Sequence, residues 1–172
     1  MPSSKKPQST DLSGLLQGLN EAGIEYIVVG GLAAVIQGAP VTTFDLDIVH
    51  RRTDQNIKNL IEFLKTVSAI QRRPDDKIVF PQFIDFSGTG HLQLITSLGP
   101  LDVLSVIEKG QGFDELKESA IEIDYKGRKT LVLRLESLVA LKRESNLQED
   151  RYRMQIYEET LRLRNESDDI EK

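Results

Sequence analysis

Residues 26–49 read YIVVGGLAAVIQGAPVTTFDLDIV, and this stretch decides the fold of the chain. An apolar run ends at two adjacent glycines, a short apolar segment follows, and a second apolar run begins after a break at Gly38 and Pro40. This order predicts a strand over residues 25–29, a glycine turn, a helix over residues 32–36, a loop, and a strand over residues 43–50.

The second predicted strand carries two aspartates, Asp45 and Asp47. Residues two apart in an extended strand point to the same face, so their carboxylates are expected to lie side by side. Two such carboxylates repel each other unless one takes up a proton or a cation binds, and Mg²⁺ favours carboxylates together with substrate phosphates. Gly30 and Gly31 let the backbone approach a ligand closely, and the helix that follows offers N–H groups to an anion. Together these features predict a site for a nucleoside triphosphate and its metal ion.

This arrangement resembles the signature of the nucleotidyltransferase superfamily whose type member is DNA polymerase β. That signature is a hydrophobic residue followed by Gly-Gly or Gly-Ser, a spacer, and then Asp-hydrophobic-Asp/Glu-hydrophobic. Here Val29-Gly30-Gly31 is separated by the thirteen residues 32–44 from Asp45-Leu46-Asp47-Ile48. Within the superfamily the chain is similar to small prokaryotic members related to the toxin half of AbiE-type abortive-infection systems.

The resemblance implies a fold and an activity. The fold is α/β (α+β), a mixed sheet of about five strands flanked by helices, with additional C-terminal helices on a polymerase-β-like core. The activity is metal-dependent transfer of a nucleoside monophosphate from a nucleoside triphosphate to a hydroxyl of RNA, a protein or a small molecule. Two Mg²⁺ ions are the expected cofactors. An antitoxin protein is a candidate partner.

A third carboxylate is expected on a neighbouring strand. Asp102 lies inside the apolar run 101–106, where an aspartate is costly to bury unless it is paired or meets a metal. The resemblance implies that Asp102 completes the metal site with Asp45 and Asp47 and helps to deprotonate the acceptor. Asp85 is the rival, although its predicted strand is shorter and less well defined. Asp124 adjoins a turn, where aspartate commonly makes local hydrogen bonds, and is interpreted as structural.

The resemblance also implies residues that bind the nucleotide. Gly30 and Gly31 would cradle the β- and γ-phosphates, and Thr43 belongs to the Gly-x-Pro-Arg-x-Thr-like segment that precedes the aspartates in the family. Lys142 either contacts the triphosphate or is a lysine that extends to solvent from the edge of the core. The pair of a basic residue and an aspartate that follows in the family is only partly matched by Glu149-Asp150-Arg151.

Two other functions are consistent with the sequence. Val41 stands where the related transferases commonly have an arginine, which favours a catalytically degenerate domain that binds a nucleotide or a partner protein and regulates it. The segment Asp45 to Val49 also resembles the motif of haloacid-dehalogenase-type phosphotransferases. That family places its motif on the first strand, wants a hydroxyl residue at the position of Val49, and lacks the glycine pair, so it fits less well.

The composition favours one domain without a membrane span. The chain has 172 residues, no cysteine, and a net charge of −5 from 22 basic and 27 acidic residues. No stretch approaches the ~20 apolar residues of a transmembrane helix. The lack of cysteine excludes disulfides and thiolate metal sites, and a cytoplasmic location is expected. The acidic balance argues against a uniformly basic surface for nucleic acid.

The organisation predicted along the chain has four parts: a flexible N-terminal tail without a secretory signal over residues 1–10, a nucleotidyltransferase core over 11–134, C-terminal helices packed on the core over 135–164, and a flexible tail over 165–172. Residues 71–90 are predicted to form a loop with short strands at 78–80 and 83–86, or an irregular flap. Arg72 and Arg73 in this segment either touch a phosphate or an acidic partner or are simply solvated.

Apolar periodicity and turn residues predict the remaining elements. These are helices over residues 12–22 behind Asp11 and over 54–67, an antiparallel pair of strands over 91–96 and 101–106, a short helix over 113–120, a hairpin over 121–125 and 128–133, and helices beginning at 135 and spanning 154–163.

Overall fold

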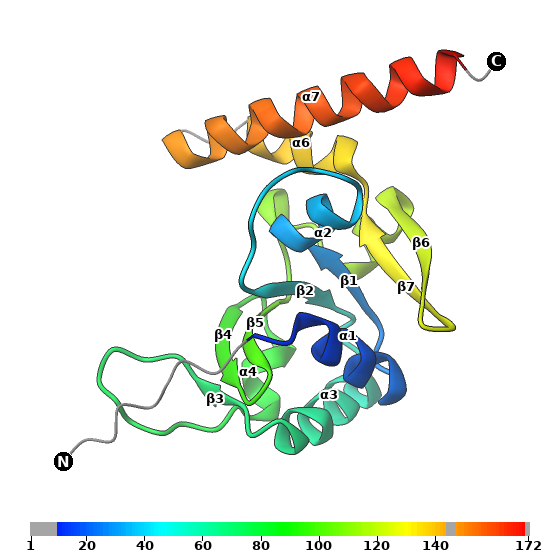
Figure 1. Ribbon diagram of the computed structural model, residues 1–172. Coiled ribbons are helices and arrows are strands. Elements are labelled where there is room, and N and C mark those ends of the chain that lie inside the picture. Colours follow the sequence, from blue (N-terminus) through cyan, green and yellow to red (C-terminus); the bar gives the residue numbers. More distant parts are fainter. Residues whose placement is uncertain (1–9, 144–146, 171–172) are drawn as a thin grey trace.

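A seven-stranded sheet organises the computed structural model, which describes residues 10–143 and 147–170 (Figure 1). The strands are β1 (Tyr26–Val29), β2 (Leu46–His50), β3 (Ile70–Gln71), β4 (His91–Thr96), β5 (Gly99–Leu104), β6 (Ala120–Tyr125) and β7 (Arg128–Leu133). Their order across the sheet is β3-β4-β5-β2-β1-β7-β6. β1 is parallel to β7 and β2 is parallel to β5, whereas the other neighbours are antiparallel. The predicted α/β class with a mixed sheet is therefore confirmed.

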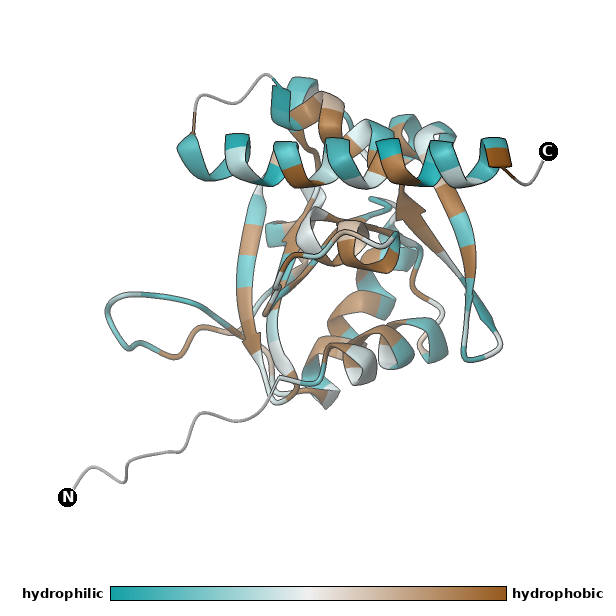
Figure 2. Ribbon diagram, turned by 45° about the horizontal axis from the view of Figure 1, so that its top comes forward, coloured by the Kyte–Doolittle hydropathy of each residue, from teal (hydrophilic) through white to brown (hydrophobic). Residues whose placement is uncertain are grey.

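The helices of the described part of the chain are α1 (Leu12–Glu21), α2 (Gly30–Ile36), α3 (Asp54–Thr66), α4 (Phe83–Ser87), α5 (Phe113–Leu116), α6 (Leu135–Arg143) and α7 (Gln148–Ile170). Figure 1 shows α7 lying across α6 at one end of the molecule, with α1 and α3 at the other end. Figure 2 shows that α7 is mostly hydrophilic, and Tyr157 is the residue that it buries. None of the helices in the described residues combines the length and apolar character needed to cross a membrane.

The middle of the sheet positions the residues of the central motif. All four residues of β1 are buried, and β1 pairs with β2 so that Val29 lies opposite Asp47. β2 in turn pairs with β5 in parallel, and this register places Asp47 opposite Asp102. The glycine pair that follows β1 and the aspartates of β2 and β5 therefore meet among the central strands, where the chain passes from β1 into α2.

Strand β2 begins later than predicted. Asp45 was expected inside a strand over residues 43–50, but β2 begins at Leu46. On the β1 side, β1 ends at Val29, opposite Asp47, and the chain then turns into helix α2, so Asp45 has no partner in β1. Thr43 instead donates hydrogen bonds from Oγ1 to the carbonyl oxygen (3.2 Å) and Oδ1 (3.3 Å) of Asp45.

The segment before β4 also differs from the prediction. Residues 83–86 were expected to be a strand or a flap, but they form helix α4, and residues 78–80 form no strand. Asp85 accepts a hydrogen bond from the backbone N–H of Gln82 (2.8 Å), which caps the helix. Local capping thus outweighs the strand preference of the apolar residues. The sheet nevertheless has seven strands instead of the expected five or so, because β3 pairs with β4 and the predicted β6–β7 hairpin joins the same sheet beside β1.

The C-terminal end of the described chain is more helical than predicted. Helix α7 continues to Ile170, well beyond the end at residue 163 that the apolar pattern predicts. Arg162 forms ion pairs with Glu159 and Glu166 one turn away on either side, and such pairs support a polar helix that has no apolar stripe. Residues 1–9 of the predicted N-terminal tail and residues 171–172 lie outside the described residues.

One buried side chain that the apolar pattern did not identify links the backbone just before β1 to the backbone just after β2. Asn56 in α3 is 3% exposed and accepts a hydrogen bond from Glu25 N (2.8 Å). Its amide donates to the carbonyl oxygens of Glu25 (2.9 Å) and Arg51 (2.8 Å).

We expect Asn56→Ala to lower the free energy of unfolding by about 2–4 kcal/mol, because it removes three hydrogen bonds made by a buried side chain. The measurement is urea unfolding followed by circular dichroism. Gln55→Ala, one residue earlier on the exposed face of α3, is the control and should change stability by less than about 0.5 kcal/mol. Equal effects of the two substitutions would contradict the structural role of Asn56.

Candidate functional site

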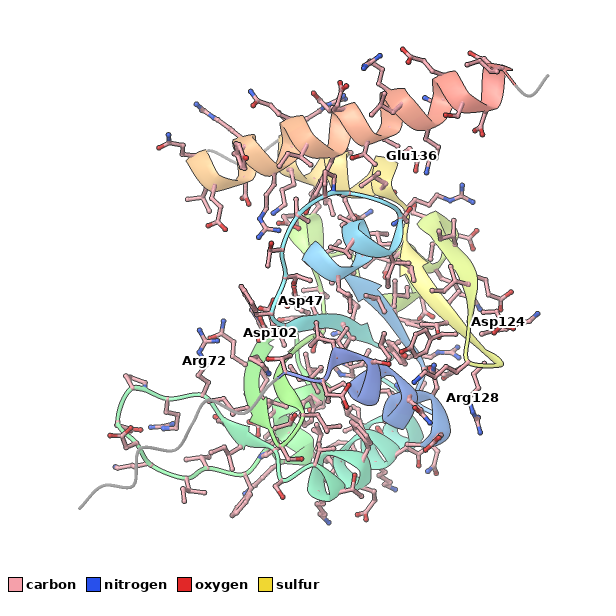
Figure 3. The ribbon with its side chains drawn as sticks, in the orientation of Figure 1. Asp47, Arg72, Asp102, Asp124, Arg128 and Glu136 are labelled. Atoms are coloured by element: carbon pink, nitrogen blue, oxygen red, sulfur yellow. The ribbon has the colours of Figure 1, made fainter. Side chains whose placement is uncertain are left out.

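Three carboxylates meet where β2 and β5 lie side by side. Asp47 and Asp102 are opposite each other in these parallel strands (Figure 3), and Asp45 lies immediately before β2. Each of the three offers an oxygen, and these oxygens all lie within 4.8 Å of one another. The sheet register places Asp47 opposite Asp102, and the residue just before β2 adds Asp45. We call these three residues, all predicted from the sequence, the aspartate triad.

The triad is partly shielded from water and not fully paired. Asp102 is 7% exposed, and its Oδ1 is buried without a hydrogen-bond partner among the described residues. Its Oδ2 lies 3.8 Å from Nε2 of His91. An unpaired buried carboxylate oxygen is costly, so this atom is suited to accept a ligand.

Burial and nearby negative charge change the titration of Asp47. Burial, the charges of Asp45 and Asp102, and the presence of Asp102 as a hydrogen-bond acceptor together raise the pKa of Asp47 to about 8. The positive charge of Lys142 opposes this rise. Without a cation, Asp47 thus keeps its proton at neutral pH.

The triad fits a divalent cation such as Mg²⁺. Hard cations bind carboxylate oxygens, and the three aspartates present oxygens from three positions around a small volume. A cation would replace the proton of Asp47 and give the buried Oδ1 of Asp102 a partner. We conclude that the donor set and its electrostatics suit a metal centre.

The glycine pair leaves room for the triad and for a ligand. Gly30 has φ +68°, and a Cβ at this position would lie 2.1 Å from Oδ2 of Asp47, so only glycine fits. A Cβ on Gly31 would lie 3.1 Å from Oγ1 of Thr43 and 3.2 Å from Nη1 of Arg153. Helix α2, which begins at Gly30, has no side-chain cap. Backbone and polar side chains thus converge beside the triad.

A pocket of about 230 Å³ opens next to the triad. Its polar lining includes Asp47, Asp102 and His91, and Lys142 and Asp150 of the C-terminal helices. Nζ of Lys142 lies 2.6 Å from Oδ1 of Asp150, and both side chains are mostly buried. Leucine and isoleucine side chains form the apolar wall, namely Leu104, Ile107, Leu133, Leu138 and Leu141.

The structure brings the predicted site residues together around one centre. The pocket is lined by Gly30, Asp47, Asp102 and Lys142. Asp45 lies beside the other two aspartates, and Thr43 lies beside Gly31. The rival Asp85 caps α4, and Asp124 accepts a hydrogen bond from Gly127 N (2.9 Å) in the β6–β7 turn, far from the triad in Figure 3.

Two predicted basic residues precede β4. Arg73 is paired with Asp75 at 2.7 Å. Arg72 is exposed, and its backbone N–H donates to the carbonyl oxygen of Gln93, the residue opposite Asp102 in the β4–β5 pair. Arg153, which lies against Gly31, was not predicted, because nothing in the local pattern of α7 says that its side chain reaches the glycine pair. His91 was missed for the same reason, since its proximity to Asp102 depends on the β4–β5 register.

Comparisons with known proteins find the same fold but no close sequence relative. No protein-family model and no curated protein sequence matches the chain. Among solved structures, the lincomycin-bound lincosamide antibiotic adenylyltransferase LnuA has a TM-score of 0.58 at 15% identity, with 86% of this chain and 94% of LnuA covered. ANT(2'')-Ia in complex with adenylyl-2''-tobramycin has a TM-score of 0.55 at 13% identity, with 87% of each chain covered.

A third similar structure is an antigenic nucleotidyltransferase-like protein from Paracoccidioides brasiliensis. Its TM-score is 0.52 at 19% identity, with 88% of this chain and 73% of that protein covered. The chain therefore has the nucleotidyltransferase fold, as the sequence predicted. The finer likeness to AbiE-type toxins stays a prediction.

The raised pKa of Asp47 predicts how stability depends on pH in the metal-free protein. Folded Asp47 keeps its proton up to a pKa of about 8, whereas the ordinary carboxyl value is 3.8. The folded state therefore binds the extra proton between these values, and the stabilisation is complete below about pH 4 and lost as the pH rises towards 8. In EDTA, the free energy of unfolding should fall over this window by at most about 1.4 kcal/mol per pH unit from this group.

Urea unfolding of wild type and Asp47→Asn in EDTA at several pH values measures this effect. Asp47→Asn should remove the downward slope, while Asp168→Asn, on the exposed end of α7, should keep it. A slope in Asp47→Asn equal to that of the wild type would contradict the proton on Asp47.

Gly30→Ala should cost more stability than its backbone angle alone explains. Gly23 has nearly the same angle, φ +70°, and a Cβ placed there would have nothing within 4 Å, so Gly23→Ala is the matched control. Both alanines lose about 1–2 kcal/mol to the left-handed backbone. Gly30→Ala should lose about 1–3 kcal/mol more because it overpacks Asp47, and it should weaken Mn²⁺ binding measured by calorimetry. Equal losses in the two variants would show that Asp47 moves aside freely.

Proposed function

We propose that the chain is a metal-dependent nucleotidyltransferase that moves a nucleoside monophosphate from a nucleoside triphosphate to an acceptor hydroxyl. The observation that carries this proposal is the aspartate triad, with oxygens within 4.8 Å of one another, beside a glycine pair that leaves the backbone accessible. The nucleotidyltransferase fold supports it, since the solved structures of LnuA and ANT(2'')-Ia share that fold.

Each member of the triad has a role in this proposal. Asp45 and Asp47 hold a divalent ion, and Asp102 completes a second ion position on the neighbouring strand. The ions, when bound, supply positive charge that offsets the charge of the phosphates and of the pyrophosphate as it leaves. Gly30 and Gly31 allow the β- and γ-phosphates to approach the backbone, and Thr43 fixes the orientation of Asp45 through its two hydrogen bonds.

The proposed transfer forms one bond to phosphorus, breaks another, and moves one proton to a side chain of the protein. The acceptor oxygen forms a bond to the α-phosphorus, the bond from the α-phosphorus to its bridging oxygen breaks, and pyrophosphate leaves with the electron pair. The hydroxyl proton passes to the carboxylate of Asp102. An acceptor packed against the apolar wall of the adjoining pocket would displace water, which otherwise competes with it.

A small hydroxylated molecule is the acceptor class that we favour. The pocket of about 230 Å³ is small, and it combines an apolar wall with carboxylates. LnuA was solved with lincomycin bound, and ANT(2'')-Ia was solved with adenylyl-2''-tobramycin. Lincomycin and tobramycin are both small molecules. RNA and protein acceptors are alternative outcomes of an acceptor screen.

Two further parts of the proposal rest on the sequence alone. The likeness of the motif to AbiE-type toxins supports an antitoxin protein as a partner, and the absence of cysteine supports a cytoplasmic site of action. The second candidate function is a degenerate regulatory domain. Val41 favours it, because this side chain packs against the core where the family commonly has an arginine.

Calorimetric titration of ATP, GTP, CTP and UTP into the protein tests the site. At least one nucleotide should bind in Mg²⁺ and not in EDTA. Asp45→Asn should weaken that binding on the order of 100-fold or more, because it removes a charge that compensates the ion. Asp168→Asn serves as the control and should bind like the wild type.

No metal-dependent binding by the wild type, or unchanged binding by Asp45→Asn, would contradict the proposed site. Binding without release of pyrophosphate across a panel of acceptors would favour the degenerate domain.

A further inference from the structure

Helix α7 brings a cationic side chain to the glycine pair. Nη1 of Arg153 lies 3.2 Å from the position of a Cβ on Gly31, and Nη2 donates to the carbonyl oxygen of Thr42 at 3.4 Å. The Arg153 side chain is 26% exposed, although most of α7 faces solvent. Arg153 therefore sits between the start of α2 and the loop that leads to Asp45.

Thr43 connects this cation to the aspartate triad. Its Oγ1 lies 3.1 Å from the same Cβ position on Gly31 at which Arg153 converges. The same Oγ1 donates to the carbonyl oxygen and Oδ1 of Asp45. Arg153, Gly31, Thr43 and Asp45 thus form a continuous path of contacts. A phosphate chain that begins at an ion on the triad would follow this path towards the guanidinium.

The charge of Arg153 is only weakly compensated by its acidic partner, Glu149. The Glu149 side chain is 80% exposed, and its Oε1 lies 3.7 Å from Nε of Arg153. Exposed pairs of this kind contribute little and are readily exchanged for a better partner. Lys142 differs, because Asp150 holds it at 2.6 Å in a mostly buried pair. A phosphate therefore binds Arg153 at a lower energetic cost than Lys142, because it does not have to break a short, mostly buried ion pair.

We infer that Arg153 binds the β- and γ-phosphates of the nucleoside triphosphate, with Gly31 leaving the space in which the contact forms. The guanidinium presents its donors in a planar fork that matches phosphate oxygens. The α-phosphate has to lie at the triad for transfer, so the phosphates beyond it are those that reach Arg153. This inference rests on the proposed function, because it assumes that the triphosphate binds at the triad.

The test compares nucleotide affinity in Mg²⁺ for the wild type, Arg153→Gln and Arg153→Lys. The nucleotide is whichever of ATP, GTP, CTP and UTP binds the wild type most tightly. Arg153→Gln should weaken binding by about 10- to 100-fold, the range expected for lost charge-assisted hydrogen bonds. Arg153→Lys should recover part of the loss, because it restores the charge without the fork. Mn²⁺ affinity without nucleotide should stay within about twofold of the wild type in both variants.

Two neighbours on α7 supply matched controls. Arg151→Gln removes an equal charge from an exposed position two residues away, and Glu149→Gln removes the partner of Arg153 while leaving the guanidinium. Arg151→Gln should bind nucleotide like the wild type, and Glu149→Gln should bind at least as tightly. The thermal midpoint of Arg153→Gln should match that of Arg151→Gln, which separates a phosphate contact from a purely structural link to Thr42.

The outcomes separate this inference from the proposed function. A wild type that binds no triphosphate in Mg²⁺ would overturn both. Metal-dependent binding that Asp45→Asn abolishes but Arg153→Gln leaves unchanged would overturn the role of Arg153 alone. Equal losses in Arg151→Gln and Arg153→Gln would also overturn it, since they would indicate a diffuse effect of charge.

Discussion

Repulsion among three carboxylates is the constraint on which the rest of the site depends. Asp47 and Asp102 are held opposite each other by the register of β2 and β5, and the same register buries Leu46 and Ile48 completely. The sheet cannot separate the two aspartates without a slip that would also expose these apolar side chains. The charge has to be balanced in place, by a proton on Asp47 or by a cation. A site that is electrostatically unfavourable when empty is thereby suited to bind metal.

Gly30, the residue that follows β1, belongs to the same constraint. Asp47 packs against Gly30 so closely that any side chain there would displace the carboxylate, and Gly30 also has the backbone angle that turns the chain into α2. One residue therefore links the direction of the chain after β1 to the position of a triad carboxylate on β2. This explains in physical terms why a glycine pair and an Asp-x-Asp pair are informative together, although each is common alone.

The sequence predicted those parts of the fold that depend on local pattern. Apolar periodicity located α1, α3 and the β6–β7 hairpin, and the spacing of the motif located Asp45 and Asp47. Asp102 was identified as an aspartate inside an apolar strand. The helix α4 was missed because a local cap decided it, and the true length of α7 was missed because ion pairs, which leave no apolar stripe, support its last turns. Asn56, His91 and Arg153 were missed because long-range packing alone gives them their partners.

The acidic and basic sides of the site are built by different physical means. Strand register sets the positions of Asp47 and Asp102, whereas the docking of α7 sets the position of Arg153. Tyr157, which α7 buries, lies four residues after Arg153 and therefore on the same face of the helix, so its packing also holds the arginine against the glycine pair. A substitution that loosens Tyr157 would move the cation while leaving the sheet and its carboxylates in place. On this argument α7 belongs to the functional site, even though its polar sequence is typical of a solvent-exposed helix.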